Sequence, residues 1–301
     1  MNGIILINKP NGFTSFDVVA KMRGILRTKS IGHAGTLDPM ATGVLPIFVG
    51  RATKCCDILP NQNKTYIADF RLGITTDTQD ITGSVLSQKP VNITKEQFYE
   101  VIESFRGDIK QIPPMYSAVK VGGKKLYELA RKGIEIEREA RDITIHSLKI
   151  LKEDFDNNEF QIEVACSKGT YIRSLCNDIG DMLGCGGVLT KLSRTVAGDF
   201  SIEDCLTLEQ VSSFAENEKT EEILIPVEKA FVSLRKTVLD KRQSQGFING
   251  VKYSLDNISQ SLEPNEKTAV YSYDGEFLGI GLADSEDNIL RICKLFKISN
   301  Q

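Results

Sequence analysis

Residues 32–46 read GHAGTLDPMATGVLP, a stretch that is too irregular for a helix and that leads into a buried strand. Its acid, Asp38, is followed by Pro39, and a residue before proline is pushed out of the helical region. Glycines at positions 32, 35 and 43 allow tight turns and close approach of another backbone. An aspartate held in such a loop can act as a nucleophile or a base; the alternative is that Asp38 only caps a turn.

Strands are predicted on both sides of this loop. Short apolar runs and alternating apolar residues are typical of strands that are buried on one or both faces. These patterns occur in GIILIN (3–8), GVLPIFVG (43–50), TYIADFRL (65–72) and EFQIEVAC (159–166).

Helices are predicted between these strands. Thr14 with Asp17, and Thr94 with Gln97, resemble capping boxes that open two helices. In KGTYIRSLCNDIGDMLG (168–184) the apolar residues recur at helical spacing, and Gly184 suits the C-terminal cap. Because strands and helices are mixed without a regular βαβ rhythm, we predict an α+β fold.

The pattern changes near residue 230. Residues 216–229 are acidic and have a helix-like pattern, whereas the chain beyond Arg235 consists of short apolar runs broken by turn signals. YSYDGEFLGIGLAD (271–284) is predicted to form a hairpin. We therefore expect a large domain over residues 1–232 and a small, mostly β domain over residues 235–301.

Composition narrows the class of protein. Hydrophobic residues at 41% and charged residues at 26% are usual for a soluble globular chain. No basic segment followed by a long apolar run opens the chain, and no stretch is long enough to span a membrane, so we expect a cytoplasmic protein. The seven cysteines show no CxxC spacing and no cluster with histidine, which indicates reduced, buried thiols and no zinc site.

Charge is unevenly distributed along the chain. The net charge is −3, but residues 1–54 hold seven basic and two acidic side chains. In residues 113–133 cations alternate with tyrosines, which suits nucleic acid through stacking and phosphate contact. A solvated helix face is the alternative. The candidate RNA-binding residues are Tyr116, Lys120, Lys124, Lys125 and Arg131.

Two further residues are candidates for a site. His33 could ligate a metal, act as a base or make a polar contact, and the metal is the weakest of the three because no other ligands are nearby. Arg173 falls in the first turn of its predicted helix, where the dipole disfavours a cation. A carboxylate partner would outweigh that cost of a few tenths of a kcal/mol; a solvated surface arginine is the alternative.

Six stretches that span about two thirds of the chain are INKPNGFTS (7–15), GHAGTLDPMATGVLPIFVGRATK (32–54), KTYIADFRLGITTDTQD (64–80), PPMYSAVKVGGKKLYELARKG (113–133), CSKGTYIRSLCNDIG (166–180) and LTKLSRTVAGDF (189–200). In this order they resemble the motifs of the TruB family of tRNA pseudouridine synthases.

The resemblance implies a role for each matching residue. Asp38 matches the essential aspartate of the family, Tyr66 the tyrosine that stacks on the target base, and Arg173 the arginine that pairs with the catalytic carboxylate. His33, Tyr171 and Leu192 match residues around the flipped nucleotide, and Lys9 and Pro10 match a structural lysine–proline pair near the site.

The resemblance also implies an architecture and a partner. The expected fold is a mixed, largely antiparallel central sheet with flanking helices, followed by a small β-rich, PUA-like RNA-binding domain. Residues 113–141 match an RNA-gripping insertion. The expected partner is the T arm of tRNA, bound by a monomer that needs no obligate protein partner and no membrane.

The implied reaction needs little beyond a carboxylate. Pseudouridine formation breaks the bond from C1′ to N1 and remakes it to C5, so no cofactor and no metal are expected. Asp38 either attacks C1′ or removes the 2′ proton, and both routes stay open. The uridine at position 55 lies inside a folded T loop and has to be flipped out. Flipping exposes a face for Tyr66 and leaves a gap that His33 can fill.

The sequence disfavours three other functions. A non-catalytic tRNA-binding or tRNA-folding protein on the same scaffold could lose Asp38, Tyr66 or Arg173, and all three are present. A related synthase that works with a guide RNA and protein partners is disfavoured by the short chain without basic tails. A metalloenzyme using His33 and Asp38 lacks a third ligand.

Overall fold

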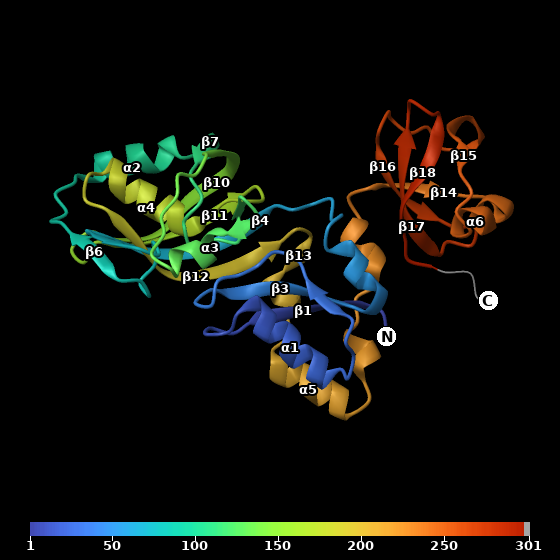
Figure 1. Ribbon diagram of the computed structural model, residues 1–301, viewed down its shortest axis with the longest axis horizontal. Coiled ribbons are helices and arrows are strands. Elements are labelled where there is room, and N and C mark those ends of the chain that lie inside the picture. Colours follow the sequence, from blue (N-terminus) through green and yellow to red (C-terminus); the bar gives the residue numbers. More distant parts are fainter. Residues whose placement is uncertain (298–301) are drawn as a thin grey trace.

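The computed structural model describes residues 1–297 and shows an elongated molecule built on one large and one small sheet (Figure 1). The large sheet has nine strands in the order β1-β3-β12-β4-β11-β10-β7, with β2 paired to β3 and β13 paired to β12. All of these pairings are antiparallel except that of β12 with β3, so the predicted mixed, largely antiparallel sheet is confirmed. The strands are β1 (Gly3–Lys9), β2 (Ile31–His33), β3 (Thr42–Val49), β4 (Lys64–Leu72), β7 (Gly107–Gln111), β10 (Arg141–Asp154), β11 (Glu159–Cys166), β12 (Gly187–Ala197) and β13 (Phe200–Ser201).

Helices cover the large sheet at both ends (Figure 1). Thr14 and Thr94 make the predicted capping boxes, and Gly184 follows the end of its helix with φ +76°. At one end Val18 packs with strand residues of β1 and β3, and at the other Phe98 stacks on Phe160 with ring centroids 4.3 Å apart. The helices are α1 (Ser15–Ile25) and α5 (Leu208–Glu216) at the first end, and α2 (Lys95–Ser104) and α4 (Ile172–Met182) at the second.

The helical pattern predicted for residues 216–229 is wrong. The helix in this region, α5, ends at Glu216, and two short 3-10 turns follow, η3 (Thr220–Ile223) and η4 (Val227–Phe231). Ile225 instead pairs with Ile4 of β1 through two backbone hydrogen bonds of 2.8 and 2.9 Å. Pro226 then cannot continue a helix, and it favours the extended conformation in the residue before it.

The C-terminal part forms a separate five-stranded sheet in the order β14-β16-β17-β18-β15. The predicted hairpin is formed by β16 (Lys267–Tyr271) and β17 (Phe277–Asp284). This sheet packs against the main body through a shared apolar cluster that joins Phe48 and Phe231 to Phe277. The remaining elements are β14 (Arg235–Val238), α6 (Lys241–Ile248), β15 (Tyr253–Ser254), η5 (Leu255–Asn257) and β18 (Ile289–Leu295).

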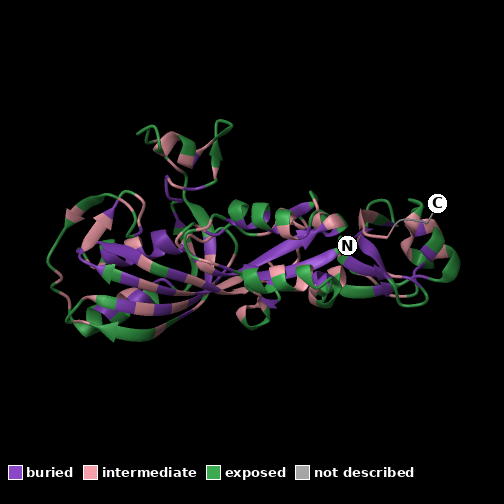
Figure 2. Ribbon diagram, turned by 90° about the horizontal axis from the view of Figure 1, so that it is seen from below, coloured by how far each residue is buried: buried purple, intermediate pink, exposed green. Residues whose placement is uncertain are grey.

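Two smaller hairpins extend from the large sheet. β5 (Ile74–Thr76) pairs with β6 (Val85–Gln88) beyond the end of β4. Residues 113–141, called the arm below, project away from the sheet and contain β8 (Lys120–Val121), β9 (Lys124–Lys125) and α3 (Leu126–Ala130) (Figure 2). The arm leaves the sheet at the end of β7 and returns at the start of β10, where Gln111 and Arg141 are cross-strand partners.

The cysteines are free thiols, and Cys55, Cys166, Cys176 and Cys185 are buried. Burial raises the pKa of the Cys176 thiol, which keeps it protonated. In residues 1–297 no helix is long and apolar enough to cross a membrane.

Candidate active site

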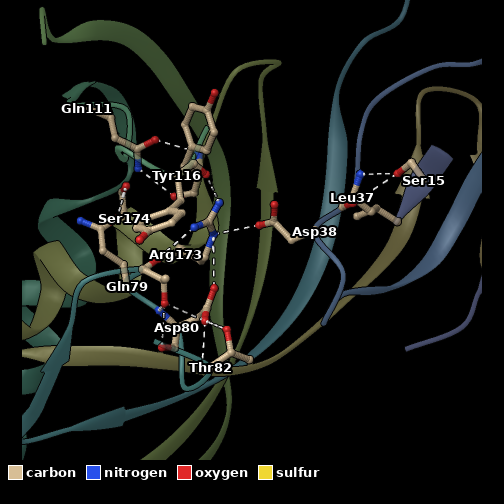
Figure 3. A network of polar contacts seen from close by, with 12 residues as sticks. Ser15, Leu37, Asp38, Gln79, Asp80, Thr82, Gln111, Tyr116, Arg173 and Ser174 are labelled. Carbon is tan, nitrogen blue, oxygen red and sulfur yellow. Dashed lines mark hydrogen bonds and ion pairs between the residues drawn. The ribbon is translucent and has the colours of Figure 1, made fainter. Parts of the chain in front are cut away.

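Asp38 and Arg173 meet at the centre of the large sheet, although they are far apart in the sequence. Oδ2 of Asp38 lies 2.8 Å from Nε of Arg173 (Figure 3). The arginine side chain is 5% exposed and the aspartate side chain is 37% exposed. Arg173 is the second residue of α4, so it does stand in the first turn, and its carboxylate partner is the acid of the GHAGTLDP loop. The pair thus presents a partly accessible carboxylate on a buried guanidinium.

The backbone of the loop that carries Asp38 is held by hydrogen bonds on both sides of the acid. The Ser15 hydroxyl accepts a hydrogen bond from Leu37 N–H at 2.9 Å and donates to the Leu37 carbonyl at 3.2 Å (Figure 3). Beyond the acid, the Pro39 carbonyl accepts from Gly12 N–H at 2.9 Å. The loop is therefore fixed to the start of α1 and to the turn before it.

Lys9 contributes to the same anchoring. Its buried ammonium donates to the carbonyls of Pro10, Phe13 and Pro39. Burial lowers the pKa of Lys9 to about 8, and the nearby Asp38 charge opposes this shift. Lys9 thus joins the turn before α1 to the residue that follows Asp38.

Arg173 has a fixed partner for each of its three nitrogens. Besides Asp38 at Nε, Nη1 donates to the Thr78 carbonyl at 2.9 Å and Nη2 donates to the Tyr116 carbonyl at 2.8 Å. A second carboxylate, Asp80, lies 3.8 Å from Nε and is itself buried. Because a guanidinium presents its donors in a rigid plane, these contacts set its orientation.

Asp80 is a site residue that sequence reasoning missed. It lies at the end of the quoted stretch KTYIADFRLGITTDTQD, but nothing in its spacing distinguished it from Asp77. The structure shows its carboxylate accepting hydrogen bonds from the Thr78 hydroxyl at 2.9 Å and from Thr82 N–H at 3.0 Å. The loop after β5 therefore supplies a second acid to Arg173.

Tyr66 and Leu192 lie in the strands beneath the acid. They belong to β4 and β12, are 6% and 5% exposed, and share an apolar cluster with Leu37 and Ala41. Burial raises the pKa of Tyr66, so its phenol stays protonated at neutral pH. The floor of the site is therefore mainly apolar.

Arg194 is a second residue that the sequence did not single out. It is 0% exposed; Nε donates to the Val44 carbonyl at 2.8 Å and Nη2 to the Gly35 carbonyl at 2.9 Å. The sequence held one indication of this burial. Arg194 lies two positions after Leu192 in a strand, so the two side chains point to the same side of the sheet. This phase with an apolar core residue could have indicated that the cation is buried.

His33 lies at the end of β2. Burial lowers its pKa, and the charge of Arg194 lowers it further, so the imidazole is neutral at neutral pH. Its buried Nδ1 has no hydrogen-bond partner within residues 1–297. That described part of the chain also holds no group of three or more His, Cys, Asp or Glu side chains that could bind a metal.

The remaining predicted residues lie on α4 and on the arm. Tyr171 is the N-cap residue of α4, two residues before Arg173. The exposed hairpin β8–β9 carries Lys120, Lys124 and Lys125, and Arg131 lies 5.4 Å from the Tyr127 ring. Among residues 1–297 no hydrogen bond or ion pair joins these cations to Asp38 or Arg173. Tyr116 alone reaches the site, through its carbonyl.

Two family models match the chain from residue 23 to residue 232. The model described as TruB family pseudouridylate synthase (N terminal domain) covers residues 23–172, and that of the tRNA pseudouridylate synthase B C-terminal domain covers residues 173–232. Both describe pseudouridine synthases, so the chain is an enzyme of this class. Within the class, the chain belongs to the TruB family.

Similar proteins agree with this assignment. The tRNA pseudouridine synthase B of Clostridium kluyveri is 46% identical over 98% of this chain and 100% of that protein, and that of Alkaliphilus oremlandii is 43% identical over 99% and 98%. A chain in the crystal structure of a Cbf5–Nop10–Gar1 complex superimposes with a TM-score of 0.78 at 26% identity, covering 98% of this chain and 85% of that chain. The protein is therefore an isomerase that makes pseudouridine in tRNA.

Proposed function

We propose that this enzyme isomerises the uridine at position 55, in the T loop of tRNA, and that Asp38 carries out the reaction. The observation that supports the role of Asp38 is its ion pair with Arg173. Its 2.8 Å contact leaves the aspartate partly exposed while the arginine is buried. The arginine supplies the opposite charge in place of water, and the free side of the carboxylate can reach a ribose.

The reaction breaks the C1′–N1 bond, turns the uracil and forms the C1′–C5 bond. The C5 hydrogen leaves as a proton, and N1 takes up a proton, so nothing is oxidised or reduced. Asp38 either attacks C1′ or removes the 2′ proton to leave a glycal. Both routes require the ionised carboxylate that Arg173 faces.

The surroundings of Asp38 suit a base that has been turned out of the RNA. Tyr66 offers an aromatic face for stacking, and its protonated phenol is a donor. Only 6% of Tyr66 is exposed, so stacking of a base on its face requires neighbouring side chains to move. The imidazole of His33, which is uncharged at neutral pH, fills the gap that the flipped base leaves in the T loop and needs no counter-ion there. Tyr171 and Leu192 complete the walls.

The outer parts of the molecule would hold the rest of the RNA. The cations of the arm contact phosphates of the T arm, and the C-terminal sheet acts as a PUA-like RNA-binding domain over residues 235–301, next to the catalytic domain of residues 1–232. The enzyme works as a monomer in the cytoplasm and needs no protein partner.

Mapping the modified position tests the choice of uridine. We expect an unmodified tRNA transcript incubated with the enzyme to gain one carbodiimide-reactive pseudouridine, at position 55. A transcript with cytidine at position 55 is the control and should gain none. Modification elsewhere in the first transcript would contradict the T-loop assignment and leave the role of Asp38 untouched.

A further inference from the structure

Gln111 lies where the arm leaves the large sheet. It is the last residue of β7, and its cross-strand partner Arg141 is the first residue of β10, so the arm is the connection between two neighbours. The Gln111 side chain belongs to a residue that is only 2% exposed. A buried amide at this position is directed into the body of the protein and away from solvent.

The Gln111 amide is hydrogen-bonded to the backbone of Tyr171 at both ends. Nε2 donates to the Tyr171 carbonyl at 3.0 Å, and Oε1 accepts from Tyr171 N–H at 2.8 Å (Figure 3). Tyr171 is the N-cap residue of α4, and its own side chain makes no capping hydrogen bond. The Gln111 side chain therefore holds the backbone of the residue at which this helix starts.

A second contact joins the same two segments. Nη2 of Arg173 donates to the carbonyl of Tyr116, which lies in the first residues of the arm, at 2.8 Å. The first turn of α4 is thus tied to the root of the arm twice, once through Tyr171 and once through the guanidinium. Figure 3 shows Gln111, Tyr116, Arg173 and Asp38 as one connected network.

We propose that Gln111 is a positioning residue that orients the guanidinium of Arg173 by fixing the first turn of α4 to the root of the arm. The inference rests on the proposed function, in which Arg173 faces the reactive carboxylate of Asp38. Every nitrogen of Arg173 has a partner, so a shift between the helix start and the arm would lengthen at least one of these contacts. A misplacement of about 1 Å costs up to about 100-fold in rate.

The coupling has a consequence for RNA binding. Gln111 anchors the segment that grips the RNA and also the helix that carries Arg173. Loss of its two hydrogen bonds should therefore slow the chemical step and leave the cations of the arm, which contact phosphate, largely unaffected.

The test is Gln111→Met, which keeps the length of the side chain and removes both hydrogen bonds. The matched control is Gln161→Met in β11, where Nε2 donates to Asp69 at 2.6 Å in the same sheet. The measurements are the single-turnover rate of tritium release from tRNA carrying 5-³H-uridine, at saturating enzyme and 20 °C, and the Kd for tRNA. We expect Gln111→Met to be slower by about 10-fold or more with Kd within about 3-fold, and Gln161→Met to keep the wild-type rate.

A merely structural role predicts a different result. It would lower the melting temperature but leave the rate unchanged at a temperature where the variant is folded. If Gln111 acts through Arg173, the double variant Gln111→Met/Arg173→Lys should be no slower than Arg173→Lys alone. A wild-type rate for folded Gln111→Met, or fully additive losses in the double variant, would overturn the proposal.

A second substitution covers the case in which Gln111→Met does not fold. Gln111→Glu keeps the acceptor for Tyr171 N–H and places an oxygen against the Tyr171 carbonyl, so we expect it to be slow as well. A folded Gln111→Glu protein with the wild-type rate would overturn the proposal. The proposed function is tested separately by Asp38→Asn and Arg173→Lys, because neither variant alters Gln111. A full rate in either of these variants would contradict the proposed function.

Discussion

Arg194 donates a hydrogen bond from Nη2 to the carbonyl oxygen of Gly35 at 2.9 Å. Its Nε donates to the carbonyl oxygen of Val44 at 2.8 Å, so one buried side chain of β12 holds both ends of the segment that carries Asp38. The acid is therefore positioned by its ion pair with Arg173 and also by a cation that lies beneath the loop. Both β12 and α4 therefore help to hold the segment between β2 and β3 that carries Asp38.

Replacing Arg194 should weaken both the fold and the reaction. Arg194→Met removes the donors that reach the carbonyls of Gly35 and Val44, and leaving a buried polar group unsatisfied costs about 1–3 kcal/mol. We expect the free energy of unfolding in urea to fall by about 2 kcal/mol or more and the single-turnover rate to fall with it. The exposed Arg235→Met is the control. Unchanged stability in Arg194→Met would show that the two hydrogen bonds contribute nothing.

Gly43 is the one position in this segment where a methyl group cannot fit. Its φ is +102°, and an added Cβ would lie 2.2 Å from the carbonyl oxygen of Arg194. We expect Gly43→Ala to lose most of its stability, by about 3 kcal/mol or more, as measured by thermal and urea denaturation. Gly24→Ala in α1 meets no atom within 4 Å and should be neutral or more stable by up to about 1 kcal/mol. Equal stability of the two variants would contradict the close contact.

Asp178 in α4 should make stability depend on pH. Burial raises its pKa from 3.8 to about 6, so the folded chain binds a proton more tightly than the unfolded chain between these values. Its contribution to stability is therefore greatest below about pH 4 and decreases until about pH 6. Asp178→Asn should melt about 2 °C higher than the wild type at pH 7.5 and equal it near pH 4. A gain that is the same at both pH values would contradict this assignment.

The arm should control affinity for RNA and not the rate of the bound complex. Lys124 and Lys125 make up strand β9 of the hairpin β8–β9; Lys124 is exposed and Lys125 is half-buried. Replacing both with alanine removes up to two phosphate contacts, so the slope of log Kd against log salt should decrease by about 2. The control is Lys149→Ala in β10, a lysine that is paired with Glu163 at 2.8 Å. A slower single-turnover rate at saturating enzyme with an unchanged salt slope would contradict the role of the arm.

Local patterns predicted the fold where the contacts that form an element are local. The capping boxes at Thr14 and Thr94 and the alternation in residues 159–166 agree with α1, α2 and β11. The helical prediction for residues 216–229 was wrong because a strand that is distant in the sequence determines their structure: Ile225 pairs with Ile4 of β1. No pattern within the segment records that pairing.

The site was predicted less completely, for a related reason. The first-turn position of Arg173 indicated a carboxylate partner, but that this partner is Asp38 came from the family resemblance. Asp80, Gln111 and Arg194 act through contacts that cross the sheet or join distant loops, and none has a spacing signal strong enough to identify it. Only the phase of Arg194 with Leu192 could have indicated its burial.

Tritium release from tRNA carrying 5-³H-uridine, measured for the wild type and Asp38→Asn side by side, tests the central claim most directly. The C5 hydrogen leaves only when the new bond from C1′ forms at C5, and an amide in place of the carboxylate can neither attack C1′ nor remove the 2′ proton. We predict release by the wild type and none by Asp38→Asn, with tRNA bound equally by both. Full release by Asp38→Asn would contradict the role of the acid, and would reduce Asp38 to a residue that only shapes its turn.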